Sequence, residues 1–159
     1  MMTREKLHHE LDDLTPKEVE TITHLVQALK RSRKSPLAYV EEMIHYEYVG
    51  QDENTGEYLH RMQITNELQN RYQILHGGIT ATFIDTSLGS TVFQLLGEEA
   101  KAVTLDLNIH FLNKGENGWL YAHTKVVKQG KTIIMLECRV VDENHKIIAT
   151  ASSTFFHIK

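Results

Sequence analysis

The feature that most constrains the fold is a glycine pair, Gly77-Gly78, at the start of a long predicted helix, residues 77–96. Glycine lets another molecule approach the backbone closely, and the first N–H groups of a helix have no partner within it. Such a helix start attracts an anion or a carbonyl oxygen. The same helix carries one acid, Asp85, among apolar neighbours. We interpret this segment as an active site; a plain turn followed by a solvated acid is the alternative for these residues alone.

Strands are predicted on both sides of this helix. Residues 45–49 and 57–65 flank a turn rich in Gly, Asp and Asn before it. After it, apolar residues alternate with polar ones over residues 103–111, so the odd-numbered positions are expected to face the helix and Thr104 to face away. Three further strands are expected at residues 119–128, 132–141 and 146–157. The small residues of the helix would let such a sheet close tightly around it.

The first part of the chain predicts a separate amphipathic helix. Thr15, Pro16 and Glu18 form the signature of a capping box with proline in the first turn. Apolar residues then recur at helical spacing, namely Val19, Ile22, Leu25, Val26 and Leu29. We therefore expect a helical extension, residues 1–36, followed by a domain of residues 37–159. The apolar stripe is expected to pack on that domain or on a neighbouring subunit, with a membrane-surface or regulatory role as the alternative.

Composition excludes several classes of function. The net charge of −4 argues against nucleic acid as the main ligand. No apolar run approaches the ~20 residues that a membrane span needs, so we expect a cytoplasmic protein. A single cysteine, Cys138, excludes an intramolecular disulfide. The ten histidines lack acids or cysteines at ligand spacing, so no metal is expected.

The spacing of Asn70, His76-Gly77-Gly78 and Asp85, followed by a helix and a run of strands, resembles that of hot-dog-fold acyl-CoA thioesterases of the phenylacetate-pathway (PaaI-like) type. The resemblance implies an α+β fold in which an antiparallel sheet wraps around a long central helix. It also implies a reaction, the hydrolysis of an acyl-CoA thioester to the free acid and CoA.

The resemblance, which covers residues 46–156, assigns roles to individual residues. Gly77 would supply an oxyanion hole, Asn70 would position the carbonyl or the attacking water, and Asp85 would act as general base or nucleophile. Thr104 is a looser match to a Ser or Thr of the family and stays a secondary candidate for the site.

Other residues are expected to contact the substrate. His76 and Gly78 belong to the turn at the carbonyl; the resemblance implies that His76 braces this turn, with a proton shuttle as the alternative. Lys128, Gly130 and Lys131 form a basic tight turn that could meet the phosphates of CoA. No cofactor is expected, because CoA is part of the substrate.

Helix geometry adds an expectation about assembly. Gly77 and Asp85 are eight residues apart, which is about 12 Å along a helix. One carbonyl cannot meet both groups, so the site is expected to combine Gly77 of one subunit with Asp85 of another in a homodimer or a dimer of dimers. Two other functions remain open: a non-catalytic acyl-CoA sensor and a hydratase or dehydratase of the same fold.

Overall fold

The computed structural model describes residues 3–97 and 99–158. Residues 1, 2, 98 and 159, parts of the expected extension and domain, lie outside the described residues. The chain divides into two compact units, Met1–Met43 and Ile44–Lys159.

Two helices of the N-terminal unit begin with a side-chain cap. Helix α2 (Pro16–Arg31) has the expected capping box: the Glu18 carboxylate accepts the Thr15 N–H at 2.8 Å, and Thr15 Oγ1 accepts the Glu18 N–H at 3.4 Å. Helix α1 (Arg4–His9) was not expected from the sequence, because one turn and a half carries too few apolar positions to show a period. Its start is marked only by Thr3, which caps it.

A third helix, α3 (Tyr39–Met43), belongs to the same unit. Arg31 Nε, at the end of α2, donates to the Glu42 carboxylate at 2.7 Å, and Arg31 Nη2 donates to the Glu42 carbonyl oxygen at 3.1 Å. This pair ties α3 to α2, which explains why the boundary between the units follows Met43 rather than residue 36.

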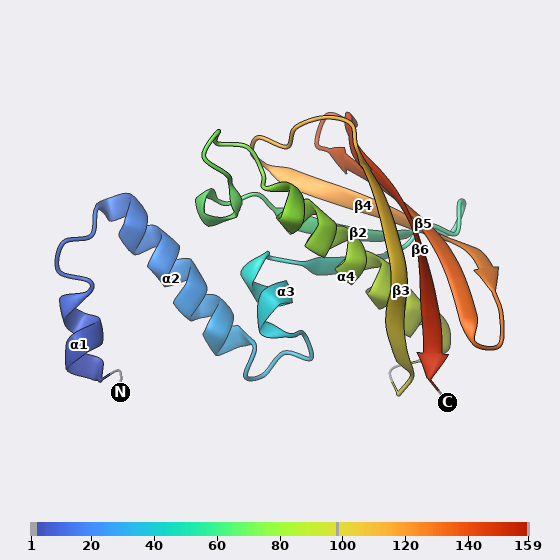
Figure 1. Ribbon diagram of the computed structural model, residues 1–159, viewed down its shortest axis with the longest axis horizontal. Helices are drawn as coiled ribbons and strands as arrows, with labels where there is room; N and C mark the ends of the chain where they lie inside the picture. Colours follow the sequence, from blue (N-terminus) through green and yellow to red (C-terminus); the bar gives the residue numbers. More distant parts are fainter. Residues whose placement is uncertain (1–2, 98, 159) are drawn as a thin grey trace. The chain divides into compact units, whose positions relative to one another are not determined.

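The second unit is the hot-dog unit, an antiparallel sheet with one long helix. Its elements are β1 (Glu47–Gln51), β2 (Tyr58–Gln63), the 3₁₀ turn η1 (Asn66–Leu68), α4 (Gly77–Leu96), β3 (Lys101–Phe111), β4 (Trp119–Gln129), β5 (Ile133–Asp142) and β6 (Ile147–Ile158). The strands lie in the order β1-β2-β4-β5-β6-β3, so β1 and β3 are the edges. Figure 1 shows α4 lying against one face of the sheet, with β3 beside it. The expected element order and the wrapped central helix are confirmed.

The core of this unit lies between α4 and the sheet. Phe83, Ile84 and Leu88 of α4 have no exposed surface, and the sheet contributes a further group of buried apolar residues, Leu120, Ile134, Leu136, Val140 and Phe155. A side-chain carbon on Gly89 would lie 3.7 Å from the Phe155 ring, so small residues do allow this close packing. In the described part of the chain, α4 and the other helices fall short of the length and apolarity needed to cross a membrane.

Strand β3 contains a β-bulge at Leu105 that the sequence did not reveal. Thr104 pairs with Phe155 and Asp106 pairs with Thr154, so Leu105 is the extra residue. The extra residue reverses which face of the sheet the side chains before it occupy. Thr104 therefore lies on the face toward α4, the same face as Phe155. The expectation that Thr104 faces away from α4 is wrong, because regular alternation was assumed through the whole strand.

Candidate active site

The start of α4 presents one backbone donor that is not used. His76 caps the helix: its Nδ1 accepts the Gly78 N–H at 3.0 Å, and its carbonyl oxygen accepts the N–H groups of Ile79 and Thr80. Among the hydrogen bonds of the described residues, none has the Gly77 N–H as donor. The two glycines therefore differ. The Gly78 N–H is hydrogen-bonded to His76, whereas the Gly77 N–H is available to a ligand.

Gly77 borders a cleft of about 370 Å³ between the start of α4, the loop before it and the end of β3. The cleft is lined by Asn70, Ile74, Leu75, Gly77, Thr80, Phe111, Leu112, Asn113, Lys114, Gly115 and Ile148. The lining is apolar along its sides, with an amide and a lysine at positions that can meet a polar group. The structure therefore brings Asn70 and Gly77 to the same cleft, as the sequence predicted.

The chain itself does not require glycine at position 77. A side-chain carbon there would lie 3.7 Å from the Phe111 ring, an ordinary contact, and the residue is helical rather than left-handed. Absence of a side chain leaves the backbone open on the cleft side. The free N–H at a helix start, next to an open cleft, suits a carbonyl oxygen that gains negative charge.

Asn70 organises the loop before α4. Its Oδ1 accepts the Tyr72 N–H at 2.8 Å, and its backbone N–H donates to the Ile74 carbonyl oxygen at 2.8 Å. The loop also holds Gln73 at φ 59°, a left-handed conformation. The amide NH₂ group of Asn70 can donate to a ligand, and Oδ1 keeps one lone pair beyond the bond to Tyr72.

Asp85 lies two turns further along α4, where it meets β3. Thr104 Oγ1 donates to Asp85 Oδ1 at 2.9 Å, and the Asp85 side chain is partly exposed. The bulge at Leu105 makes this contact possible, because it turns Thr104 toward the helix. Neither Asp85 nor Thr104 lines the cleft at Gly77 of the same chain.

The basic turn lies at the other end of the sheet. Lys128 and Gly130 belong to the hairpin between β4 and β5, whereas Gly77 is near the end of β3 and the beginning of β4. Gly130 is required by the turn itself, since a side-chain carbon there would lie 2.8 Å from the Ile133 carbonyl oxygen. Contact of Lys128, Gly130 and Lys131 with substrate stays a prediction.

The C-terminal half of α4 meets a buried polar cluster. His60 has no exposed surface; its Nδ1 lies 2.9 Å from the Tyr46 hydroxyl, and its Nε2 lies 3.0 Å from Thr91 Oγ1 and 3.3 Å from Thr124 Oγ1. Burial, reinforced by nearby His123, lowers the pKa of His60 to about 3. This imidazole stays neutral and enclosed, and it is structural.

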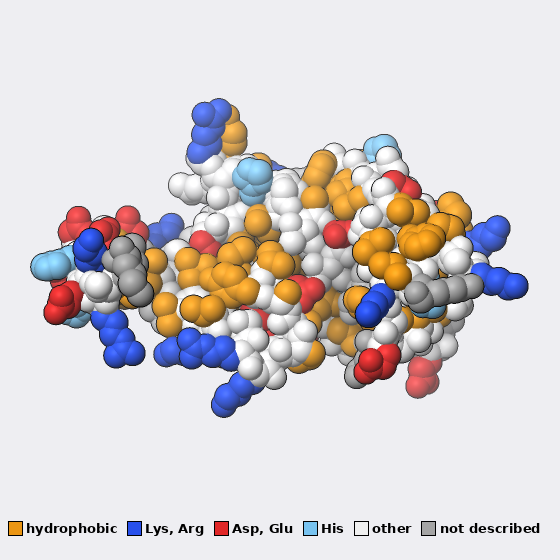
Figure 2. Space-filling view, turned by 60° about the horizontal axis from the view of Figure 1, so that its bottom comes forward, with side chains coloured by type: hydrophobic (Ala, Val, Ile, Leu, Met, Phe, Trp, Pro, Cys, Tyr) orange, Lys and Arg blue, Asp and Glu red, His pale blue; other side chains and the backbone are white. Residues whose placement is uncertain are grey.

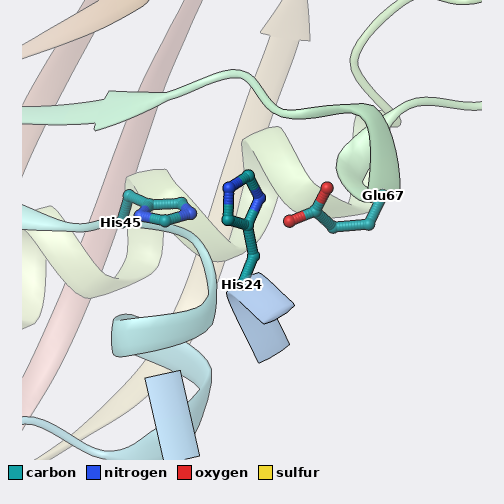
Figure 3. Close-up of side chains that lie close together, drawn as sticks. All are labelled: His24, His45 and Glu67. Carbon is teal, nitrogen blue, oxygen red and sulfur yellow. The ribbon is translucent and has the colours of Figure 1, made fainter. Parts of the chain in front are cut away.

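Another pair of potential ligands lies in the hot-dog unit. Figure 3 shows His45, which precedes β1, and Glu67 of η1, with ligand atoms within 4.8 Å of one another. His24, also labelled there, comes from α2 in the N-terminal unit. The expectation that the protein binds no metal stays a prediction.

Sequence reasoning missed several lining residues, among them Thr80 and Phe111. Phe111 carried a usable signal: it is the last helix-facing position of β3, at the end of the strand nearest the start of α4. Thr80 lies one turn after Gly77, which gives it the same helix face. Lys114 follows β3 in a loop, and its place in the cleft depends on tertiary contacts that no local pattern encodes.

Comparison with known proteins gives the family. The thioesterase superfamily matches residues 72–149, which include Gly77, Asp85 and Thr104. Acyl-coenzyme A thioesterase 13 of Homo sapiens is 34% identical over 104 residues, which make up 62% of this chain and 71% of that protein. The protein SSO1253 of Saccharolobus solfataricus is 29% identical over 82 residues, 52% of this chain; the chain spans about half, 54%, of that relative.

Solved structures agree on the fold. The BH2602 protein of Bacillus halodurans, crystallised with CoA, has a TM-score of 0.85 and 29% identity, covering 94% of this chain and 98% of that one. The PaaI protein of the E. coli phenylacetic acid degradation operon has the same fold, with a TM-score of 0.69 at 22% identity over 86% of this chain and 95% of that one. The chain therefore belongs to the thioesterase superfamily, a family of thioester hydrolases with the hot-dog fold.

Proposed function

We propose that this protein hydrolyses acyl-CoA thioesters to a free acid and CoA. The observation that carries the proposal is the unused Gly77 N–H, which opens on a cleft at the start of α4. The acyl-CoA part of the proposal is supported by the name of the human relative and by the CoA in the Bacillus structure.

The residues of the cleft suit the polarisation of a thioester carbonyl. Its oxygen would accept the Gly77 N–H, aided by the positive end of the α4 dipole. The Asn70 amide would hold the carbonyl or the attacking water. Lys114, at the same cleft, is placed to meet an anionic part of the substrate.

Asp85 would supply the carboxylate, as general base for water or as nucleophile. As a base it takes a proton from water while the water oxygen bonds to the carbonyl carbon; the carbon–sulfur bond then breaks, and the CoA thiolate leaves and takes up a proton. Thr104 would orient Asp85, because its hydroxyl holds one carboxylate oxygen and leaves the other free to act.

Two chains would build each site. Gly77 and Asp85 are about 12 Å apart along α4, whereas an oxyanion donor and a base must reach the same carbonyl group. Gly77 lies near Phe111 at one end of β3, and Asp85 lies near Thr104 toward its other end. A two-fold axis near the middle of β3 would pair this edge strand with its copy, and the partner's Asp85 would then approach Gly77.

The edge of the sheet supports this arrangement. Strand β3 carries apolar side chains that are well exposed: Leu105 is 56% and Phe111 is 55% exposed. An exposed apolar edge strand is a ready template for pairing with another chain. The same two-fold axis would bring the partner's basic hairpin of Lys128, Gly130 and Lys131 to the Gly77 end, where it could contact CoA phosphates.

A Gly77→Pro substitution tests the oxyanion donor. Gly77 is the first residue of α4, where proline is tolerated, and His76 has ψ 133°, which suits a residue before proline. The substitution removes the N–H while keeping the helix start, so we expect kcat to fall by about 10²- to 10³-fold. Release of free thiol from a panel of acyl-CoAs measures the rate.

Gly77→Ala is the matched control for this experiment, because it keeps the N–H and adds a side chain for which the chain has room. A proline variant that folds, judged by circular dichroism, and hydrolyses acyl-CoA as fast as the alanine variant would refute the role of the Gly77 N–H.

Mixed dimers test the two-chain site. Gly77→Pro and Asp85→Asn chains are co-expressed with different affinity tags, and dimers carrying both tags are purified. Each mixed dimer has one intact site of two, so we expect about half of the wild-type activity, although each variant alone is inactive. Mixed dimers as inactive as the single variants would show that each chain carries its own site.

A further inference from the structure

Helix α2 exposes a stripe of apolar side chains. Val19, Ile22, Val26 and Leu29 are 47%, 36%, 42% and 47% exposed, and Figure 2 shows hydrophobic side chains gathered along this part of the N-terminal unit. The less exposed side chains of α2, including Leu25 and Ala28, lie to one side of the stripe. The stripe therefore adjoins the face that α2 already buries, and its own side chains stay exposed.

The spacing of the stripe suits helix pairing. Its residues are three, four and three positions apart, the a and d positions of two heptads. The a positions hold Val19 and Val26, and the d positions hold Ile22 and Leu29, so all four are apolar side chains that can fill the seam between two helices. A second helix with the same spacing can interdigitate with this stripe.

The charges at the two ends of α2 set the direction of such a pair. Acids outnumber cations before and within its first turns (Asp12, Asp13, Glu18 and Glu20 against Lys17), and cations cluster at its end (Lys30, Arg31, Arg33 and Lys34). Arg31 is engaged with Glu42, and the other three cations line the same pocket as Arg31. A parallel pair would place like charges together, whereas an antiparallel pair places acids beside cations and opposes the helix dipoles.

We propose that two copies of this chain bind each other through their α2 helices, antiparallel, along the stripe of Val19, Ile22, Val26 and Leu29. Val19 then packs opposite Leu29 of the second copy, and Ile22 packs opposite Val26. These pairings put the two-fold axis at the level of residue 24, so the two Thr23 side chains flank the axis, about 3 Å apart along the helices.

The charge pattern favours a second copy over a lipid surface. Amphipathic helices that bind anionic membranes are rich in Lys and Arg along the whole polar face. The polar positions of α2 combine acids and cations, with Glu18 and Glu20 in the half that would have to approach the lipid head groups. The opposite charges at its two ends are instead complementary to those of a second α2 helix that runs in the opposite direction.

Cross-linking of the full chain tests the pairing. Thr23→Cys introduces an exposed thiol at the expected two-fold axis, and Gln27→Cys introduces one about a turn away on the polar face as the control. The natural Cys138 does not interfere, because burial raises the pKa of its thiol to about 12. With a short bis-maleimide, Thr23→Cys is expected to form cross-linked dimer at least about fivefold faster than Gln27→Cys.

Three results would overturn the proposal. Equal cross-linking rates for the two cysteine variants would show that the chains react by random collision and do not form a specific pair. Faster cross-linking through Val19→Cys than through Thr23→Cys would show a parallel pair. Unchanged cross-linking of Thr23→Cys after Ile22→Glu and Val26→Glu are added would exclude the stripe. Co-sedimentation with phosphatidylserine vesicles, with Thr23→Cys at the control rate, would identify a lipid surface instead.

Discussion

The polar groups in the two halves of α4 differ in how far they are hydrogen-bonded within the chain. In the C-terminal half, Thr91 lies against Thr124 and against His60, a histidine without exposed surface that also meets Tyr46. In the N-terminal half, the Gly77 N–H has no acceptor among the described residues. Asp85 there accepts a hydrogen bond from the Thr104 hydroxyl and stays partly exposed. One helix thus supplies both the anchor of the fold and the chemical groups of the candidate site.

The difference has a physical reason. Buried polar groups must be paired, because an unpaired one costs about 1–3 kcal/mol, and the cluster around His60 meets this need within the chain. Groups intended for a substrate must stay unpaired until it binds, so they are placed at a helix start and at a sheet edge, where water can satisfy them. Substitutions in the two halves should therefore have distinct consequences for turnover and for stability.

Asp85→Asn is expected to have the largest effect on turnover. The amide keeps the shape and the contact with Thr104 but cannot take a proton or attack a carbonyl, so kcat should fall by about 10²-fold or more with the melting temperature little changed. Asp106→Asn, which changes an exposed acid of the same sheet edge, is the control. Asp85→Asn turnover within a few fold of wild type would remove Asp85 from the mechanism.

Thr104→Val should have an intermediate effect. Valine keeps the shape and removes the hydroxyl that orients Asp85, so kcat should fall by about tenfold with little change in KM. Thr104→Ser restores the hydroxyl and should recover most of the rate. If serine and valine variants are equally slow, Thr104 acts by packing alone.

The sequence predicted most of the fold because its periods are regular. Helix α4 was expected at residues 77–96, which are its observed bounds, and the capping box of α2 was visible from Thr15 and Glu18. Both signals are local: a cap and an apolar period are complete within one turn or one element. The same holds for the order of the elements along the chain, which follows from the run of alternating segments.

The failures concern contacts between elements. The bulge at Leu105 has no glycine to mark it, and its flanks alternate regularly, so the contact between Thr104 and Asp85 could not be derived from strand periodicity. Likewise, the sequence did not reveal that Asn70 Oδ1 accepts the Tyr72 N–H within the loop before α4; contact of Asn70 with substrate stays a prediction. The sequence pattern identified the candidate site residues, but tertiary contacts determine which atoms of these residues can contact a ligand.

His60→Gln should have the smallest effect on turnover at neutral pH and a clear effect on acid stability. The folded protein holds the pKa of His60 at about 3, against about 6.5 in the unfolded chain, so the unfolded chain takes up the proton first as pH falls. Stability from the neutral imidazole is complete above pH 6.5 and is lost progressively between pH 6.5 and 3. Between pH 7 and 4.5 the wild-type free energy of unfolding should fall by about 2–3 kcal/mol from this group. Glutamine cannot titrate, so urea unfolding of the variant at the two pH values should give a smaller difference, and equal differences would show that His60 is not what makes the fold sensitive to acid.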